Sequence, residues 1–204
     1  MWNDRYARDD YLFGTEPADF LRRVERFLSP GQSALCVADG EGRNSVWLAG
    51  QGLRVTAFDP AANAVAKARK LASERDVTVD FQLCDLDGWD WSRPFDVVAG
   101  IFIQFVGPDE RVVLFDRLDR SLRPGGLLLL HGYAPRQVDY GTGGPPYREN
   151  MYTLDLLRES FAGYDVLRDA DFDAEVDEGK GHSGRSALID FVARKPGREG
   201  HAKG

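Results

Sequence analysis

Short apolar runs punctuate the first two thirds of the chain. Each has four to nine residues, and most are bounded by Gly, Pro or Asp. The run at 95–103 is apolar almost throughout, which is typical of a strand buried on both faces of a parallel sheet. Residues 77–83 instead alternate apolar and polar positions. We predict strands at residues 34–38, 53–58, 77–83, 95–103 and 127–131.

The segments between these runs repeat their apolar residues at intervals of three and four, which indicates amphipathic helices. We expect helices at residues 16–28, 44–50, 63–75 and 108–122, the last opened by Pro108 and followed by Pro124-Gly125-Gly126. Strands that alternate with helices imply right-handed crossovers and a doubly wound parallel sheet.

The C-terminal third has a different pattern. A Pro- and Gly-rich loop at 134–150 precedes a short helix at 153–161. Two apolar segments, 164–172 and 185–193, follow without a helical pattern between them, which predicts an antiparallel hairpin. The expected fold is α/β, with a mostly parallel seven-stranded sheet and an antiparallel hairpin at its end.

Composition restricts the function classes. The chain of 204 residues is 43% hydrophobic and 29% charged, which suits a single domain, predicted at residues 1–195, with a disordered tail at 196–204. A net charge of −7 disfavours nucleic acid as a partner. The absence of an apolar signal core or membrane-length run favours a cytoplasmic protein, monomeric or homodimeric. Cys36 and Cys84 suit core positions, and no Cys/His spacing indicates a metal site.

The first predicted strand ends in the most informative motif, Asp39-Gly40-Glu41-Gly42. Glycines at such a strand-to-helix turn let the backbone approach a ligand. The second strand ends in another acid, Asp59, about 20 residues on, where a carboxylate accepts hydrogen bonds from ribose hydroxyls. The unit is therefore predicted to hold a nucleoside, although Gly-x-Gly alone also occurs at ordinary strand-to-helix turns.

The acidic residues at this turn indicate which nucleoside it would bind. The third glycine of the dinucleotide fingerprint is replaced by Ser45, and Asp39 and Glu41 would repel a pyrophosphate at the helix N-terminus. A cationic sulfonium nucleoside suits the same acids. S-adenosylmethionine is therefore favoured over NAD, and a nicotinamide-dependent oxidoreductase is disfavoured.

The run Asp39-Gly40-Glu41-Gly42-Arg43-Asn44-Ser45 resembles the first motif of class I S-adenosylmethionine-dependent methyltransferases, in the form found in the tellurite-resistance type and related bacterial enzymes. Asp85-Leu86, Pro94 to Val98 and Leu122 to Gly126 extend the resemblance over roughly residues 2–195. Glu41 departs from the pattern, since many relatives have a small or neutral residue there.

The resemblance implies the cofactor contacts. Asp85 would accept from the adenine amine and Leu86 would pack on the ring, although Asp85 also suits a turn cap, and Gly100 would leave room for the methionine moiety. The expected cofactor-binding residues are Tyr11, Gly14, Asp39, Gly40, Glu41, Gly42, Arg43, Asn44, Asp59, Pro60, Cys84, Asp85, Leu86, Gly100 and Ile101.

The N-terminal segment, residues 1–16, is rich in aromatic residues, among them Trp2, Tyr6 and Phe13. These side chains could fold over the cofactor as a lid that excludes water, or pack against the sheet edge without a further role. The resemblance implies the lid, with Tyr11 and Gly14 near the methionine end.

Candidates for the acceptor side are fewer. His131 ends the fifth strand and His182 lies in the Gly-rich hairpin connection. Either could act as a base. Alternatively, His131 is a hydrogen-bonded histidine at a strand end, and His182 belongs to a solvated loop. In the long loop, Arg136 and Arg148 would suit an anionic acceptor, whereas Tyr140 and Tyr147 would suit an aromatic one. The leading interpretation is a methyltransferase that acts on a small molecule by in-line transfer, and the alternative is a non-catalytic S-adenosylmethionine sensor or partner subunit.

Overall fold

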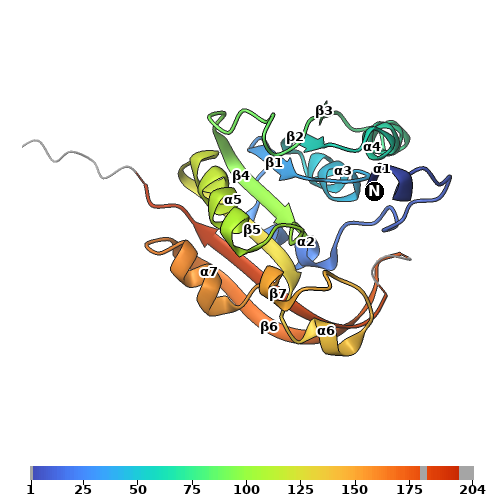
Figure 1. The fold of residues 1–204 in the computed structure, drawn as a ribbon. Coiled ribbons are helices and arrows are strands. Elements are labelled where there is room, and N and C mark those ends of the chain that lie inside the picture. The colour runs from blue at the N-terminus through green and yellow to red at the C-terminus, as the bar shows by residue number, and fades with distance from the viewer. Residues whose placement is uncertain (1, 180–182, 198–204) are drawn as a thin grey trace, which may run out of the picture.

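The computed structural model describes residues 2–179 and 183–197. A seven-stranded sheet runs through the molecule in the order β3-β2-β1-β4-β5-β7-β6 (Figure 1). Its strands are β1 (Ser33–Val37), β2 (Arg54–Asp59), β3 (Val79–Leu83), β4 (Phe95–Ile101), β5 (Leu122–Tyr133), β6 (Asp165–Asp177) and β7 (Ser183–Arg194).

Strands β1 to β5 are parallel, whereas β7 runs antiparallel to both β5 and β6. The predicted fold class is therefore confirmed. From β1 the chain builds outward through β2 and β3 and then returns to place β4 on the other side of β1. In open α/β sheets, ligands bind beyond the carboxyl ends of the strands at such a reversal of strand order.

Helices cover both faces of the sheet (Figure 1). They are α1 (Trp2–Arg5), α2 (Asp19–Val24), α3 (Arg43–Gly50), α4 (Ala62–Glu74), α5 (Pro108–Arg120), α6 (Gln137–Tyr140) and α7 (Leu154–Ser160), with 3₁₀ turns η1 (Glu25–Phe27) and η2 (Arg148–Asn150). One apolar cluster packs α2, α3 and α4 on the sheet. Another packs α5 and α7 on the opposite face.

Successive residues of the central strands enter opposite clusters. Leu128 faces α5 and α7, while Leu127 and Leu129 face the other helices. A strand buried on both faces leaves no polar positions, which explains its continuous apolar run. The helix ends also follow local chemistry: Glu110 Oε2 accepts from Gly107 N at 2.9 Å at the start of α5, and Thr153 Oγ1 accepts from Leu156 N at 3.1 Å at the start of α7.

Several boundaries differ from those predicted. β5 begins at Leu122, because Leu122 pairs with Phe95 before a bulge restores the register from Val97. The hairpin strands are longer than predicted, since their pairing continues to Asp177 and Ser183. The first predicted helix is only α2 and η1, and the N-terminal segment contains a further short helix, α1.

No helix among the described residues is long and apolar enough to cross a membrane. Cys36 and Cys84 are free thiols, the first buried and the second partly so. Most of the predicted tail, residues 198–204, lies outside the described residues, as does His182.

Candidate functional site

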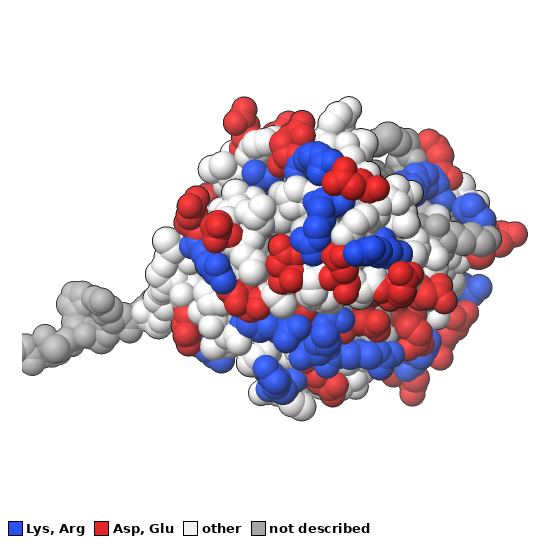
Figure 2. Space-filling view, turned by 90° about the horizontal axis from the view of Figure 1, so that it is seen from below, with Lys and Arg blue, Asp and Glu red and all other residues white. Residues whose placement is uncertain are grey.

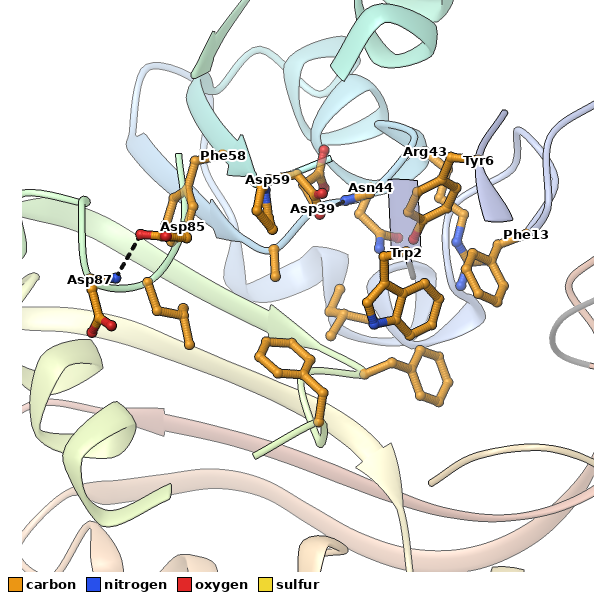
Figure 3. A pocket seen from close by; sticks show the side chains of 17 residues that line it. Trp2, Tyr6, Phe13, Asp39, Arg43, Asn44, Phe58, Asp59, Asp85 and Asp87 are labelled. Atoms are coloured by element: carbon orange, nitrogen blue, oxygen red, sulfur yellow. Dashed lines mark hydrogen bonds between the residues drawn. The ribbon is translucent and has the colours of Figure 1, made fainter. Parts of the chain in front are cut away.

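A cavity of about 360 Å³ lies where β1, β2 and β4 end, beside the loop after β3 (Figure 3). Residues from four strand ends, from the start of α3 and from the N-terminal segment line it. They are Trp2, Tyr6, Phe13, Ala38, Asp39, Gly40, Arg43, Asn44, Phe58, Asp59, Pro60, Asp85, Leu86, Asp87, Ile101, Phe102 and Phe105.

Nine of the predicted cofactor residues line this cavity: Asp39, Gly40, Arg43, Asn44, Asp59, Pro60, Asp85, Leu86 and Ile101. The other six, Tyr11, Gly14, Glu41, Gly42, Cys84 and Gly100, do not line it. The sheet topology therefore gathers the strand-end acids as expected, but several glycines and Glu41 have other roles.

Asp59 is held in place by backbone donors. Its Oδ2 accepts from Gly40 N and its Oδ1 from Ala61 N, both at 2.9 Å. Burial raises the pKa of Asp59, whereas the two backbone hydrogen bonds lower it. Each carboxylate oxygen has a second lone pair, so the residue can cap the turn and still accept from a ligand hydroxyl.

Asp39 lies beside Asp59 and accepts a short hydrogen bond from Ser45 Oγ. Burial, together with the nearby Asp59, raises the pKa of Asp39 to about 7, although the Ser45 hydrogen bond lowers it. A cationic ligand would therefore stabilise the ionised form of the Asp39 carboxylate. Ser45, at the position of the missing third glycine, is fully buried.

The two glycines of the motif differ. Gly40 has φ +63°, and an added Cβ would lie 3.0 Å from Tyr6 Oη, so this position keeps backbone exposed to the cavity. Gly42 has φ +89°, and an added Cβ would lie 2.6 Å from Ala68 Cβ. Gly42 thus permits close packing of α3 on α4, and it does not line the cavity.

Glu41 is buried outside the cavity. Its Oε1 accepts from Lys67 Nζ at 2.8 Å and its Oε2 from Leu12 N at 2.7 Å. The lysine neutralises the carboxylate, so Glu41 does not supply the electrostatic effect predicted for it. It instead fastens the N-terminal segment to α4.

The loop after β3 places Asp85, Leu86 and Asp87 at the cavity. Asp85 Oδ1 accepts from Asp87 N at 3.1 Å and from Gly88 N at 2.8 Å. The turn-cap alternative therefore holds for Asp85, and the residue also lines the cavity. Cys84 packs into the core behind it.

The end of β4 differs from the prediction in one residue. An added Cβ at Gly100 would lie 2.5 Å from Ile103 Cδ1 and 2.9 Å from Leu130 Cδ2, so core side chains occupy the room predicted for methionine. Ile101, Phe102 and Phe105 line the cavity instead.

The N-terminal segment borders the cavity with three rings. Trp2 stacks on Tyr6 with 5.8 Å between ring centroids, and Phe13 lies 6.4 Å from both. The same rings pack on Ala61 and Ala64, and their role as a lid over the cofactor stays a prediction. Tyr11 instead donates to Lys67 O at 3.2 Å, outside the cavity.

Two residues at the start of α3 connect the cavity to distant segments. Arg43 Nη2 lies 2.7 Å from Glu178 Oε2, and both side chains are almost fully buried. Asn44 Oδ1 accepts from Ala18 N at 2.9 Å. Gly14, predicted near the methionine, packs against Gly179 of the hairpin connection instead.

His131 is a structural residue. Its ring stacks on Phe20 with 4.9 Å between centroids, and Nδ1 faces Ile189 O and Asp190 Oδ1, both at 2.9 Å. Both are acceptors, so Nδ1 is the donor. Since His131 is buried and does not line the cavity, its predicted role as a base is not supported.

The four predicted acceptor residues of the long loop also lie outside the cavity lining. Arg136 pairs with Asp171 and Asp173 of β6, Arg148 pairs with Asp139, and Tyr140 donates to Asp173 Oδ2 at 2.7 Å; Tyr147 is exposed. The face seen in Figure 2 shows such interspersed basic and acidic side chains. These four residues thus lie apart from the cavity, and their contacts with an anionic or aromatic acceptor stay a prediction.

Sequence reasoning missed Ala38, Phe58, Asp87, Phe102 and Phe105 as lining residues. Phe58 directly precedes Asp59, Phe102 directly follows β4, and Phe105 lies three residues further on. Proximity to a strand end was the available signal. Which ring turns toward the cavity depends on backbone geometry, such as the φ of +57° at Phe102.

The sheet order and the acids at its strand ends define a Rossmann-like, nucleoside-binding class of protein. The sequence profile of a methyltransferase domain matches residues 34–126, the part that supplies β1 to the start of β5. A carboxy-S-adenosyl-L-methionine synthase of Shewanella amazonensis is 34% identical over 83 residues, which are 40% of this chain and 34% of that protein. The match thus spans about a third of that relative.

Solved structures share the fold. TehB from Haemophilus influenzae superposes with a TM-score of 0.67 at 19% identity, over 87% of this chain and 61% of that one. The magnesium protoporphyrin IX methyltransferase of Synechocystis, with bound S-adenosylhomocysteine, superposes with a TM-score of 0.66 at 17% identity. The superposition covers 87% of this chain and 80% of that one. Residues 34–126 thus match a methyltransferase domain, and the chain has the fold of these solved structures, as the sequence predicted. The Synechocystis enzyme is also solved with bound S-adenosylmethionine, with a TM-score of 0.63 at 17% identity.

Proposed function

We propose that this protein transfers the methyl group of S-adenosylmethionine to a small-molecule acceptor by in-line displacement. The main support is that Asp39, Asp59 and Asp85, from three successive strand ends, line one cavity. Its volume of about 360 Å³ falls in the range of roughly 300–1,000 Å³ typical of small-molecule sites.

The residues fit the cofactor. Asp59 would accept from the ribose hydroxyls, Asp85 and Leu86 would hold the adenine, and Asp39 with the Gly40 backbone would hold the methionine end. The cofactor, when bound, supplies an electrophilic methyl group on a sulfonium. An acidic cavity favours that positive charge, and its pairing would return the raised pKa of Asp39 toward ordinary values.

The chain's own contribution is alignment and exclusion of water. Trp2, Tyr6 and Phe13 cover one end of the cavity, and the anchored carboxylates need no rearrangement to receive the nucleoside. A displacement whose leaving group is a neutral thioether requires no protonation, so the lack of histidine among the described lining residues is compatible with turnover.

Binding and turnover test this proposal separately. Titration calorimetry with S-adenosylmethionine, S-adenosylhomocysteine and NAD should show binding of the first two only. Labelled S-adenosylmethionine should then pass its methyl to one member of an acceptor panel. Binding without transfer to any acceptor would favour the sensor or partner-subunit alternative, and binding of NAD alone would overturn the proposal.

A further inference from the structure

Three aromatic rings lie together at one end of the cavity. Figure 3 shows Trp2, Tyr6 and Phe13 at one end and Asp85 and Asp87 at the other, with Asp59 and Asp39 between them. Phe102 and Phe105 also line the cavity. Phe105 is 44% exposed, so part of its ring is accessible from outside the protein.

This order fixes which end faces the acceptor. If Asp85 and Leu86 hold the adenine and Asp59 the ribose, the sulfonium lies beyond Asp39, toward Trp2 and Phe13. An acceptor must approach the methyl carbon from that side. This placement of the acceptor rests on the proposed function and extends that function to the chemistry of the acceptor.

Phe102, which lines the cavity, is held in an unfavourable backbone conformation. Its φ is +57°, which is unusual for a bulky residue. Phe102 N donates to His131 O at 2.8 Å, and its ring lies 4.8 Å from His131 and 4.9 Å from Tyr133, centroid to centroid. Strain of this kind persists where the surroundings enforce it, and it is concentrated at ligand-binding sites.

Charge at the cavity disfavours an anionic acceptor. Among the described residues that line it, Arg43 alone is cationic, and it is paired with Glu178. Four aspartates, Asp39, Asp59, Asp85 and Asp87, line the same cavity. An oxyanion would meet acids without a cation to pair with, whereas an uncharged ring would meet other rings.

We propose that the methyl acceptor is an uncharged, planar aromatic molecule, bound between Trp2, Phe13, Phe102 and Phe105. A heteroatom on this ring forms the new bond to the methyl carbon with its lone pair. The carbon–sulfur bond breaks, its electron pair stays on sulfur, and the proton of the heteroatom passes to water.

Two measurements test this inference. Protein saturated with S-adenosylhomocysteine is titrated with 2-naphthol, cyclohexanol and selenite, and labelled methyl transfer is scored with 2-naphthol, benzenethiol, an aliphatic thiol and selenite. Both are repeated with Phe105→Ala and with Tyr147→Ala, an exposed aromatic outside the cavity lining. We expect 2-naphthol to bind and Phe105→Ala to weaken it roughly 3- to 10-fold, with unchanged cofactor affinity. Tyr147→Ala should change neither the affinity for 2-naphthol nor the affinity for the cofactor.

The outcomes separate the two proposals. Binding of 2-naphthol that depends on Phe105, with no transfer to any acceptor, would support the aromatic site and count against the methyltransferase function. Transfer only to selenite or the aliphatic thiol would overturn the aromatic assignment and leave the function intact. Absence of 2-naphthol binding, or binding that Phe105→Ala leaves unchanged, would also overturn the assignment.

Discussion

Arg43 and Glu178 form a buried ion pair that joins the start of α3 to the β6–β7 connection. The Nη2–Oε2 distance is 2.7 Å, and the two side chains are 7% and 11% exposed. Glu178 Oε1 also accepts from Asp19 N at 3.0 Å. One carboxylate thus fastens the hairpin connection both to the cavity and to α2, across 135 positions of sequence.

Removing this carboxylate should destabilise the fold. Glu178→Ala leaves the Arg43 guanidinium buried without its partner, which typically costs about 3 kcal/mol. Urea unfolding measures the loss. Glu175→Ala, at an exposed position of the preceding strand β6, is the control and should change stability by less than about 0.5 kcal/mol. Equal effects of the two variants would show that the pair contributes no special stability.

A second prediction concerns the contact between α3 and α4. Gly42→Ala places a methyl group 2.6 Å from Ala68 Cβ at a φ of +89°, so we expect a loss of about 3 kcal/mol in unfolding free energy. Gly50→Ala, in the same helix with open space around it, should be neutral or slightly stabilising. A Gly42→Ala variant as stable as Gly50→Ala would refute the packing role.

The contrast between these glycines shows what the sequence could reveal. The Gly-x-Gly turn, the strand-end acids and the continuous apolar strands follow from local patterns, so the fold and most of the nucleoside site were predictable. Packing partners were not. Whether a glycine faces a ligand or Ala68 depends on a helix 26 residues further along the chain, whose position no local pattern specifies.

Charged side chains show the same limit. Glu41 was predicted to act on the ligand, but it binds Lys67 and the backbone of Leu12. Arg136 was predicted to act on an acceptor, but the register of the hairpin brings Asp171 and Asp173 beside it. A sequence shows where charged residues occur, whereas the tertiary structure decides which of them pair with each other and which can contact a ligand.

Asp59 should contribute strongly to cofactor binding. Asp59→Asn removes the ionised acceptor for the ribose hydroxyls, which we expect to weaken S-adenosylmethionine binding by about 1.5–3 kcal/mol. Titration calorimetry measures the dissociation constant, with thermal unfolding as the check on folding. Asp116→Asn, exposed on α5, is the control. An unchanged dissociation constant in folded Asp59→Asn would remove the ribose assignment.

Asp39 should make cofactor binding depend on pH. Burial raises its pKa from 3.8 to about 7, so it is mainly protonated at pH 6. In the free protein this shift means that folding stability falls as the pH rises from about 4 through 7. A bound cation favours the ionised form, so the affinity for S-adenosylmethionine should rise severalfold, up to roughly tenfold, between pH 6 and 8.

The Asp39→Asn variant isolates this effect, because any pH dependence that remains belongs to the ligand or to other groups. Calorimetry in buffers of different ionisation enthalpy should also detect proton release by the native protein near pH 6. If Asp39→Asn keeps the full pH dependence, Asp39 is not the group that titrates.

His131 provides the last prediction. Its Nδ1 donates to Ile189 O and to Asp190, and Asp190 is also paired with Arg23 and Arg168 at 2.9 Å. His131→Asn can keep a donor near this position but loses the stacking on Phe20, so we expect a loss of about 1–2 kcal/mol in stability. Because the ring lies outside the cavity lining, the pH profile of kcat should not change. Steady-state kinetics across pH, once an acceptor is known, decide the point. A folded His131→Asn variant that loses turnover would return this histidine to the reaction.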